Sequence, residues 1–349
     1  MEEVNGMKQN GIRAKIVGTG SFVPDVAVKN KELTDIIGIK DAEWIYKNLG
    51  IEERRFSATL DKMTGQVVTR NITDIDLAHE AAIRAIQDAR LSPEQINGLW
   101  YVSCTQNPEK HHHFSQAAIE LHDRLGLGVD AFANEIDSGC GGVMQAIGIS
   151  NDMIKGDDKA NILIVASNQP SWFIDRELYV ATHNWLSIYI FGDGAGAVLL
   201  QKAEKTNKGI VSSYYGADGS NPLMYYRYKD RGNHPVYEID AKAVKDLFPV
   251  LMKRSLSGLR KKYRFELDEI KRFYFHQANR WILEGFAEFL EIPLERVAIN
   301  VDKYGNLSAA STLVLLDEDI KEGRVKKGDL LLFCAVGAGA QYGAFLVRL

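Results

Sequence analysis

The feature that most constrains the fold of this sequence is an alternation of short apolar strands with amphipathic helices, found in both halves of the chain. In the first half we expect strands at 14–20, 99–103, 130–136, 160–167 and 194–200, with helices at 77–89, 114–125 and 143–154. In the second half we expect strands at 210–215, 271–276, 298–301, 330–335 and 343–347, with helices at 242–265, 280–290 and 308–321. This order predicts sheets whose faces are covered by helices.

The two halves have a similar order of elements, and this predicts an internally duplicated α/β fold. A chain of 349 residues exceeds the usual size of a single core. We expect a flexible tail at 1–10, an N-terminal half at 11–202 and a C-terminal half at 203–349. Polar residues that follow strands in each half then meet between the halves.

Composition excludes several classes of function. The chain is 46% hydrophobic and 25% charged with a net charge of -4, which argues against nucleic acid as a partner. Three cysteines without a pairing pattern predict no disulfide framework and therefore a reducing, cytoplasmic location. Because no apolar run reaches about 18 residues and the first residues lack the pattern of a signal peptide, we expect no membrane span.

Cys140 is the strongest candidate for a reactive group. It stands between glycines in Asp137-Ser138-Gly139-Cys140-Gly141-Gly142, directly before the expected helix at 143–154. A helix N-terminus favours a thiolate and can hold an oxyanion. The alternative is a small buried cysteine in a crowded turn. The glycines favour the nucleophile, since packing alone does not require them and the approach of a substrate does.

Other glycine and histidine motifs do not predict a cofactor or a metal. Gly18-Thr19-Gly20 suggests a strand that enters a tight turn, but the third glycine of a dinucleotide fingerprint is absent. The glycines from 192 to 196 precede a strand and fit no phosphate-binding pattern. His111, His112 and His113 are adjacent, point in different directions and are best interpreted as a solvated loop.

His276 and Asn306 are the candidates in the second half. His276 ends an expected strand, where sites of α/β proteins are built, and Asn306 lies in a turn that enters a helix. Taken singly, each has a structural interpretation, as a core histidine or a turn asparagine.

Together with Cys140, these segments resemble the β-ketoacyl-acyl-carrier-protein synthase III family of the thiolase superfamily, over essentially the whole chain. The matching segments are 18–24, 43–45, 50–55, 191–197, 276–279 and 304–311. The resemblance implies a thiolase-like fold, in which two pseudo-symmetric βαβαβαββ halves form layers in the order α/β/α/β/α.

The resemblance also implies a mechanism. Cys140 would take an acyl group from a thioester and pass it to a carbanion formed by decarboxylation of a malonyl thioester. His276 and Asn306 would donate hydrogen bonds to the enolate, which favours a neutral imidazole. The backbone N–H groups of Cys140 and Gly339 would form the oxyanion hole, with Ala338 tolerated if its φ is negative.

The resemblance assigns substrate-binding residues and partners as well. Trp44, Ala241 and Asn279 match positions along the pantetheine arm, and Phe114 matches an aromatic residue that crosses a homodimer interface into the partner's acyl tunnel. The alternative for Phe114 is a core residue at a helix start. Substrates would be coenzyme A or acyl-carrier-protein thioesters, with no bound cofactor.

The sequence departs from the family at positions that bind coenzyme A. Two arginines that family members would use to hold coenzyme A are replaced. Asn48 stands at the position expected shortly after Trp44, and Trp185 stands at the one before Phe191. Weakened binding of coenzyme A is therefore expected.

Basic residues suggest a face for an acidic acyl carrier protein: Lys253, Arg254, Arg260, Lys261 and Arg280. A solvated helix end is the alternative for the basic segment of the long helix.

Two rival functions stay open. The same Cys-His-Asn site could transfer an acyl group to oxygen or nitrogen, or condense without decarboxylation. A non-catalytic subunit that binds an acyl chain or carrier is the rival from another class, and retention of all three polar groups argues against it.

Overall fold

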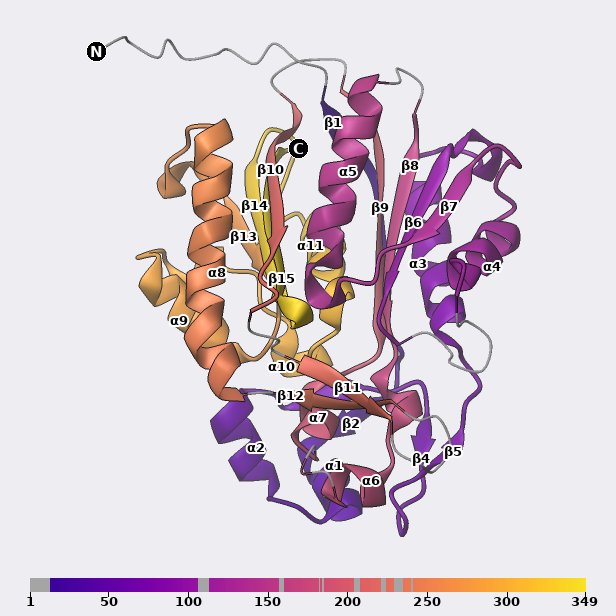
Figure 1. Cartoon of the computed structure of the whole chain (residues 1–349), viewed down its shortest axis with the longest axis vertical. Coiled ribbons are helices and arrows are strands. Elements are labelled where there is room, and N and C mark those ends of the chain that lie inside the picture. Colours follow the sequence, from indigo (N-terminus) through magenta and orange to yellow (C-terminus); the bar gives the residue numbers. More distant parts are fainter. Residues whose placement is uncertain are drawn as a thin grey trace.

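The protein is built from two β-sheets that stand side by side with helices between them and on both outer faces (Figure 1). The computed structural model describes residues 13–105, 113–156, 160–181, 183, 185–203, 208–220, 224–228, 235–239 and 241–349. The layers follow the order α/β/α/β/α, which confirms the expected fold class. Among the residues described, no helix is both long and apolar enough to span a membrane.

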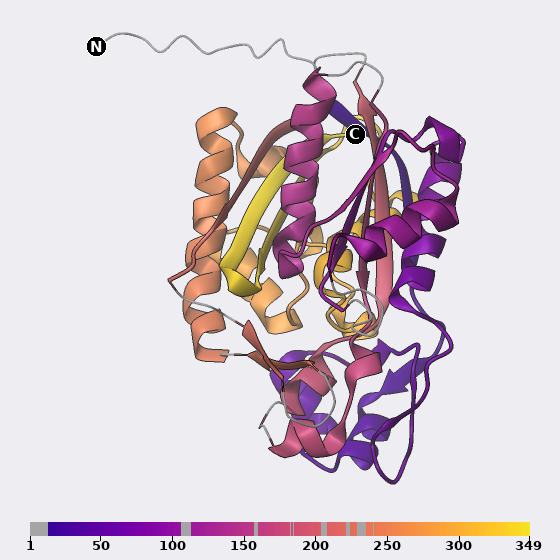
Figure 2. The ribbon, with the colours of Figure 1, turned by 45° about the vertical axis from the view of Figure 1, so that its right-hand side comes forward.

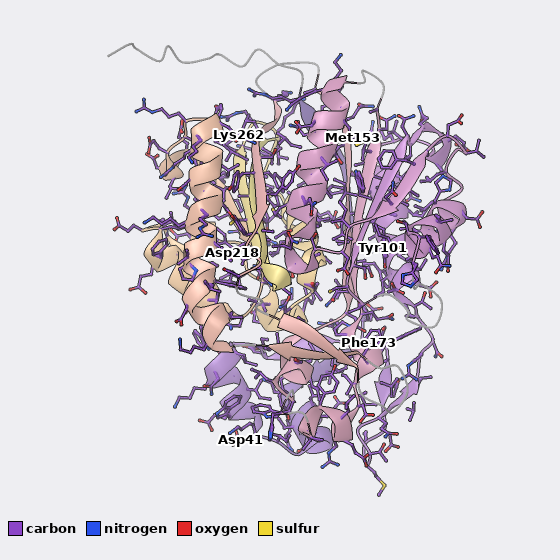
Figure 3. All side chains as sticks on the ribbon, viewed as in Figure 1. Asp41, Tyr101, Met153, Phe173, Asp218 and Lys262 are labelled. Carbon is purple, nitrogen blue, oxygen red and sulfur yellow. The ribbon has the colours of Figure 1, made fainter. Side chains whose placement is uncertain are left out.

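The first sheet has the strand order β1-β9-β8-β6-β7. Its strands are β1 (Ala14–Phe22), β6 (Gly98–Ser103), β7 (Phe132–Glu135), β8 (Ile162–Asn168) and β9 (Gly194–Lys202). Helices α3 (Asp74–Asp88) and α4 (Gln116–Leu125) cover its outer face, and α5 (Gly142–Gly156) covers its inner face. Inside this half, the buried Tyr101 on β6 donates from its hydroxyl to the Asp74 carboxylate at 2.7 Å (Figure 3).

The second sheet has the order β10-β15-β14-β13, from β10 (Gly209–Ala217), β15 (Gln341–Arg348), β14 (Leu330–Gly337) and β13 (Arg272–Phe275). Helices α8 (Ala241–Lys262) and α9 (Arg280–Phe289) lie outside it, and α11 (Ser311–Lys321) lies against α5 and the first sheet in the central layer. The two halves therefore follow the same path.

One expected strand, at 298–301, does not form. Val297 makes a single bridge to Phe273, and helix α10 (Val301–Tyr304) begins directly afterwards. The 3-10 turn Leu294–Arg296 ends just before Val297, so only a few residues between turn and helix are extended. The second sheet consequently has a bridge where the first sheet has β7.

Strand β1 and helix α3 differ in detail from expectation. The tight turn expected at Gly18–Gly20 is absent, because β1 continues to Phe22. A Cβ on Gly18 or Gly20 would lie 2.2 Å from a backbone oxygen of α3, so these glycines let the helix pack closely on the strand. The helix begins earlier than the expected residue 77, since Thr73 caps it and Asp76 completes the capping box.

Short elements that the sequence did not predict cover one end of both sheets, below them in Figures 1 and 2. They are α1 (Asn30–Ile37), α2 (Ala42–Leu49), α6 (Arg176–Ala181), α7 (Trp185–Ile190), β2 (Ala27–Lys29), β3 (Glu53–Arg55), β4 (Thr59–Leu60), β5 (Val67–Thr69), β11 (Met224–Tyr228) and β12 (Pro235–Ile239). The fully buried Arg54 joins several of them by donating to the carbonyl oxygens of Val28 at 3.1 Å and Tyr189 at 2.8 Å. Burial lowers the Arg54 pKa to about 9.

The expected division of the chain stays a prediction. Its boundary between residues 202 and 203 falls between β9 and β10. The tail expected at 1–10 lies outside the described residues.

Candidate active site

Cys140 lies in the 3-10 turn Gly139–Gly141, which leads directly into α5. Its side chain lines a cavity of about 220 Å³ at the end of the sheets that faces the short covering elements. The cavity is lined by Cys104, Thr105, Asp137, Ser138, Gly139, Cys140, Asn168, Pro170, Phe191, Ser308, Ala338, Gly339 and Gln341. The candidate nucleophile is therefore open to a small ligand.

The glycines around Cys140 act differently from the expectation. Gly139 has φ +49°, a left-handed conformation that favours glycine. A Cβ on Gly141 would lie 3.1 Å from the Gln341 carbonyl oxygen, and one on Gly142 would lie 2.5 Å from Val102. The interpretation that packing does not need these glycines was wrong, because Gly141 and Gly142 allow close packing of protein against protein.

Ser308 connects the three candidate catalytic residues. Its hydroxyl oxygen lies 3.3 Å from the Cys140 sulfur, and its backbone N–H donates to Asn306 Oδ1 at 2.7 Å. The backbone of Ser308 also acts on the pKa of His276, which places the imidazole next to it. The structure thus brings Cys140, His276 and Asn306 together around one residue, although each follows a different strand or turn.

His276 is neutral near pH 7. It follows β13, its side chain is 5% exposed, and burial lowers its pKa to about 4. Its Nδ1 is buried and has no hydrogen-bond partner among the residues described. That nitrogen is left for a ligand.

Asn306 is fixed by contacts at both its side chain and its backbone. Because Oδ1 accepts from the Ser308 N–H, the amide Nδ2 is the group left to donate. The backbone N–H donates to the Ile190 carbonyl at 2.8 Å, and the backbone oxygen accepts from Gly192 at 3.2 Å. Asn168, which lines the cavity, also donates to the Gly192 oxygen at 3.1 Å.

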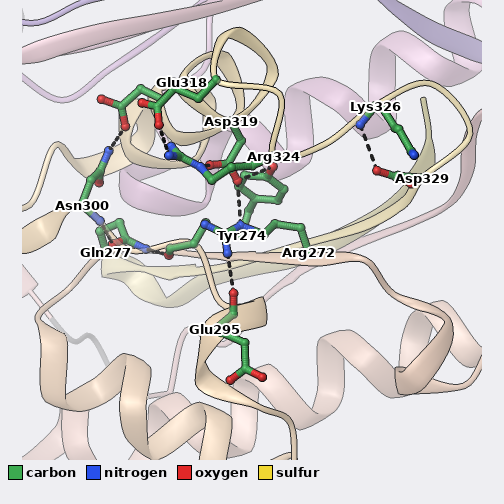
Figure 4. A network of polar contacts seen from close by, with 12 residues as sticks. Arg272, Tyr274, Gln277, Glu295, Asn300, Glu318, Asp319, Arg324, Lys326 and Asp329 are labelled. Carbon is green, nitrogen blue, oxygen red and sulfur yellow. Dashed lines mark hydrogen bonds and ion pairs between the residues drawn. The ribbon is translucent and has the colours of Figure 1, made fainter.

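A polar network behind the site holds the segments that carry His276 and Asn306 (Figure 4). Gln277, next to His276, donates to the Ala298 carbonyl at 3.1 Å and accepts from the Asn300 backbone N–H at 3.2 Å. Asn300 in turn donates to Glu318 on α11 at 3.0 Å. The network ties β13 to the segment before α10 and to α11.

The protonation of Cys140 also differs from a simple expectation. Burial raises the thiol pKa to about 11, while the hydrogen bond from Ser308 and the backbone N–H of Cys140 act in the opposite direction. The helix N-terminus was expected to favour the thiolate, yet desolvation by burial outweighs it. The resting group is therefore the thiol.

The expected oxyanion-hole residue Gly339 lines the same cavity as Cys140 and has φ +119°. Ala338 is not among the residues with positive φ, so the condition for replacing a glycine there is met. A Cβ on Gly337 would lie 2.7 Å from the Cys140 nitrogen, which shows how closely this turn approaches the nucleophile.

The expected substrate-binding residues lie apart from the cavity lining. The Trp44 ring on α2 packs on Trp185 of α7 with ring centroids 5.7 Å apart. Asn279 caps α9, since its Oδ1 accepts from the Ile282 N–H at 2.9 Å. Ala241 begins α8, and its side chain lies outside the described part of the structure.

Phe114 is 88% exposed, so the alternative of a core residue at a helix start was wrong. It precedes α4 with φ +60°.

The expected carrier-docking residues are spread along the surface. Lys253, Arg254, Arg260 and Lys261 are exposed on α8, and Arg280 begins α9, where it pairs with Glu284 at 2.9 Å. Figure 3 places Lys262, the neighbour of Lys261, at the end of α8 far from the short covering elements. Arg260 and Lys261 therefore lie at the opposite end of that helix from α2, which contacts α9 near Arg280.

Several residues of the site were not predicted from the sequence. Cys104, Asp137, Asn168, Phe191 and Ser308 all line the cavity, whereas His276 and Asn306 are not among its lining residues. Cys104 and Asn168 end strands or follow them, so the rule that sites form at strand ends could have found both. Asp137 and Ser308 belong to motifs recognised in the sequence, but no role was predicted for either residue.

Comparison with known proteins identifies the family of the chain. Residues 135–219 match the family described as "3-Oxoacyl-[acyl-carrier-protein (ACP)] synthase III", and residues 261–349 match its C-terminal part. The β-ketoacyl-acyl-carrier-protein synthase III of Alkalilimnicola ehrlichii is 33% identical, with 96% of this chain and 99% of the relative covered. That of Aquifex aeolicus is 31% identical with the same coverage, and its crystal structure superimposes with a TM-score of 0.83 over 96% of this chain and 100% of that chain. The chain therefore belongs to the β-ketoacyl-acyl-carrier-protein synthase III family of condensing enzymes.

Proposed function

We propose that this protein is an acyltransferase that makes a 3-oxoacyl product by decarboxylative condensation, with Cys140 as the acyl carrier. The observation that carries the proposal is the position of Ser308, which contacts Cys140 at 3.3 Å and Asn306 at 2.7 Å and whose backbone lies next to His276. A thioester bound at Cys140 would then lie within reach of both neutral donors.

In the first step the Cys140 sulfur attacks the carbonyl carbon of an acyl thioester. The bond from that carbon to the donor sulfur breaks, and the thiol proton of Cys140 leaves with the departing thiol. The backbone N–H groups of Cys140 and Gly339 stabilise the oxyanion of the intermediate. The acyl group is then held as a thioester of Cys140.

In the second step a malonyl-type thioester loses carbon dioxide. The electron pair of the broken C–C bond forms an enolate, whose oxygen accepts hydrogen bonds from His276 and from Asn306 Nδ2. Because His276 is neutral, it stabilises the oxygen without an accompanying proton exchange with solvent. The enolate carbon attacks the acyl carbonyl, and the Cys140 thiolate leaves and takes up a proton from solvent, which restores the resting thiol.

An acyl carrier protein is the proposed carrier of the acyl donor. Trp185 fills the space against Trp44, and the Lys40 ammonium lies 5.0 Å from the Trp44 ring centroid. No arginine of the described residues stacks on Trp44 to hold an adenine. Lys253, Arg254 and Arg280 offer positive charge to an acidic carrier.

A homodimer is also proposed. Strand β7 lies at the edge of the first sheet, and Phe114, with most of its surface exposed, precedes the helix that packs on β7. An exposed aromatic beside an open sheet edge favours burial against a second copy.

Mass spectrometry of the intact protein tests the proposal. Incubation with matched acyl-coenzyme A and acyl-carrier-protein donors is expected to add one acyl group to the wild type, faster from the carrier, and none to Cys140→Ala. Addition of a malonyl thioester should then release carbon dioxide and the 3-oxoacyl product.

Each rival function gives a different result in this experiment. An acyl adduct that is discharged to an oxygen, a nitrogen or a carbon acceptor without carbon dioxide would contradict condensation by decarboxylation. No adduct from any donor on a folded protein would support the non-catalytic subunit.

A further inference from the structure

Two thiols and one hydroxyl lie together inside the cavity. Ser308 Oγ is 3.3 Å from the Cys140 sulfur and 3.7 Å from the Cys104 sulfur. The three side chains come from different parts of the fold: the end of β6, the start of α5 and the turn before α11. Ser308 is only 3% exposed, so little water competes for its hydroxyl.

The direction of the two contacts follows from proton counting. A serine hydroxyl has one hydrogen, so it can donate to only one of the two sulfurs at a time. Burial raises the pKa of Cys104 to about 12 and that of Cys140 to about 11, and the neighbouring Cys140 raises Cys104 further. When Cys140 reacts as a thiolate it can only accept, so the Ser308 hydrogen points to its sulfur and Ser308 Oγ is left to accept from the Cys104 thiol.

The backbone of Ser308 gives a second reason to assign a role to the hydroxyl. Ser308 has φ +50°, in the left-handed region that favours glycine. The corresponding turn before α5 has Gly139 at φ +49°. Serine at this position is therefore strained where glycine would be relaxed, and strain of this kind is kept at functional sites.

We propose that Ser308 is a catalytic residue that donates a hydrogen bond to the Cys140 sulfur, and that Cys104 is a positioning residue that orients the Ser308 hydroxyl. The inference rests on the proposed role of Cys140 as the acyl carrier. The Ser308 hydrogen bond stabilises negative charge on the sulfur when Cys140 attacks and again when it leaves after condensation. No proton of Ser308 is consumed in either step.

The rate of Cys140 alkylation by iodoacetamide as a function of pH tests the inference without any acyl donor. Peptide mapping assigns the modified cysteine. Ser308→Ala is expected to slow alkylation of Cys140 about tenfold near pH 8 and to move the inflection of the profile to higher pH, as loss of a hydrogen bond to a charged group predicts. Cys104→Ala should slow it about twofold, and Cys104→Ser should restore the rate.

Ser311→Ala is the matched control. Ser311 lies three residues away, is 1% exposed, and its hydroxyl has no hydrogen-bond partner in the described part of the chain. Its removal should leave the profile unchanged. Ser308→Gly removes the same hydroxyl while relieving the positive φ, so it serves if the alanine variant folds poorly.

A wild-type profile in folded Ser308→Ala or Ser308→Gly would overturn the inference, as would an equal shift in Ser311→Ala. Because alkylation needs no thioester, a failure of the proposed condensation would appear in the acyl-adduct experiment and not here.

Discussion

Burial sets the charge of the two groups at the centre of the site. The pKa of His276 falls to about 4 and that of Cys140 rises to about 11, so both groups are neutral in the resting protein. A neutral imidazole suits donation to an enolate. A neutral thiol, by contrast, needs hydrogen-bond donors that stabilise the thiolate before it can act as a nucleophile. Ser308 and the backbone N–H groups of the turn are the candidate donors.

His276 should also make the stability of the fold depend on pH. Its pKa is about 4 in the folded protein, against an ordinary histidine pKa of 6.5, so between these values the unfolded chain binds a proton that the folded protein does not. Stability therefore falls as pH falls through this window. We expect His276→Gln to reduce the loss in unfolding free energy between pH 7 and pH 4.5 by about 2 kcal/mol, measured by denaturant titration.

The buried Asp193 titrates in the same range with the opposite sign, because burial raises its pKa to about 6. It is present in both proteins, so the comparison of wild type with His276→Gln removes its contribution. An identical pH dependence of the two proteins would contradict the buried, neutral His276.

At the scale of elements, equivalent segments of the two halves build the site. Cys104 follows β6 as His276 follows β13, and the 3-10 turn with Cys140 precedes α5 as the turn with Ser308 precedes α11. The first residues of these two turns, Gly139 and Ser308, share a positive φ. Because the two halves follow the same path, the ends of β6 and β13 and the starts of α5 and α11 meet at the site.

The position of the Asn306 turn depends on its close contact with Gly192. A Cβ on Gly192 would lie 2.0 Å from the Tyr304 carbonyl oxygen, and the Gly192 N–H donates to the Asn306 oxygen. Gly192→Ala is expected to destabilise the protein by about 2 kcal/mol and to reduce condensation strongly, because the Asn306 turn must move. Thermal unfolding and product formation measure the two effects.

Gly285→Ala is the control, since nothing lies within 4 Å of the added Cβ in the middle of α9. It should raise stability by roughly 0.5–1 kcal/mol and leave condensation unchanged. Equal activity of Gly192→Ala and wild type would show that Asn306 does not depend on this contact.

At the scale of the whole molecule, the short elements cover one end of both sheets (Figure 2). The cavity is lined by residues from strand ends, such as Asn168, and by Pro170 and Phe191 next to those elements. Strand β7 is the edge strand of the first sheet, and the exposed Phe114 lies just before α4. This edge is the proposed dimer interface.

Sedimentation analysis tests that interface. The wild type is expected to sediment as a dimer at micromolar concentration. Phe114→Asp should weaken association at least about tenfold, because a charge would be buried in an apolar contact. Val26→Asp, also at an exposed apolar residue but in the segment before β2, is the matched control and should leave the dimer intact. A monomeric wild type would contradict the proposal.

The sequence alone determined the alternation of strands and helices and the α/β fold class, because periodicity and motif spacing are local signals. Cys140, His276 and Asn306 were predicted from motifs that resemble those of the family, and their catalytic roles stay predictions. The sequence analysis missed the short covering elements, because two- and three-residue strands carry little pattern. It also placed a strand at 298–301, where a 3-10 turn occupies the residues just before and leaves too few for a strand. Only the tertiary structure brought Cys104 and Ser308, 204 positions apart, to the same sulfur-lined cavity. It alone decided the charge states as well, because desolvation depends on everything packed around a group.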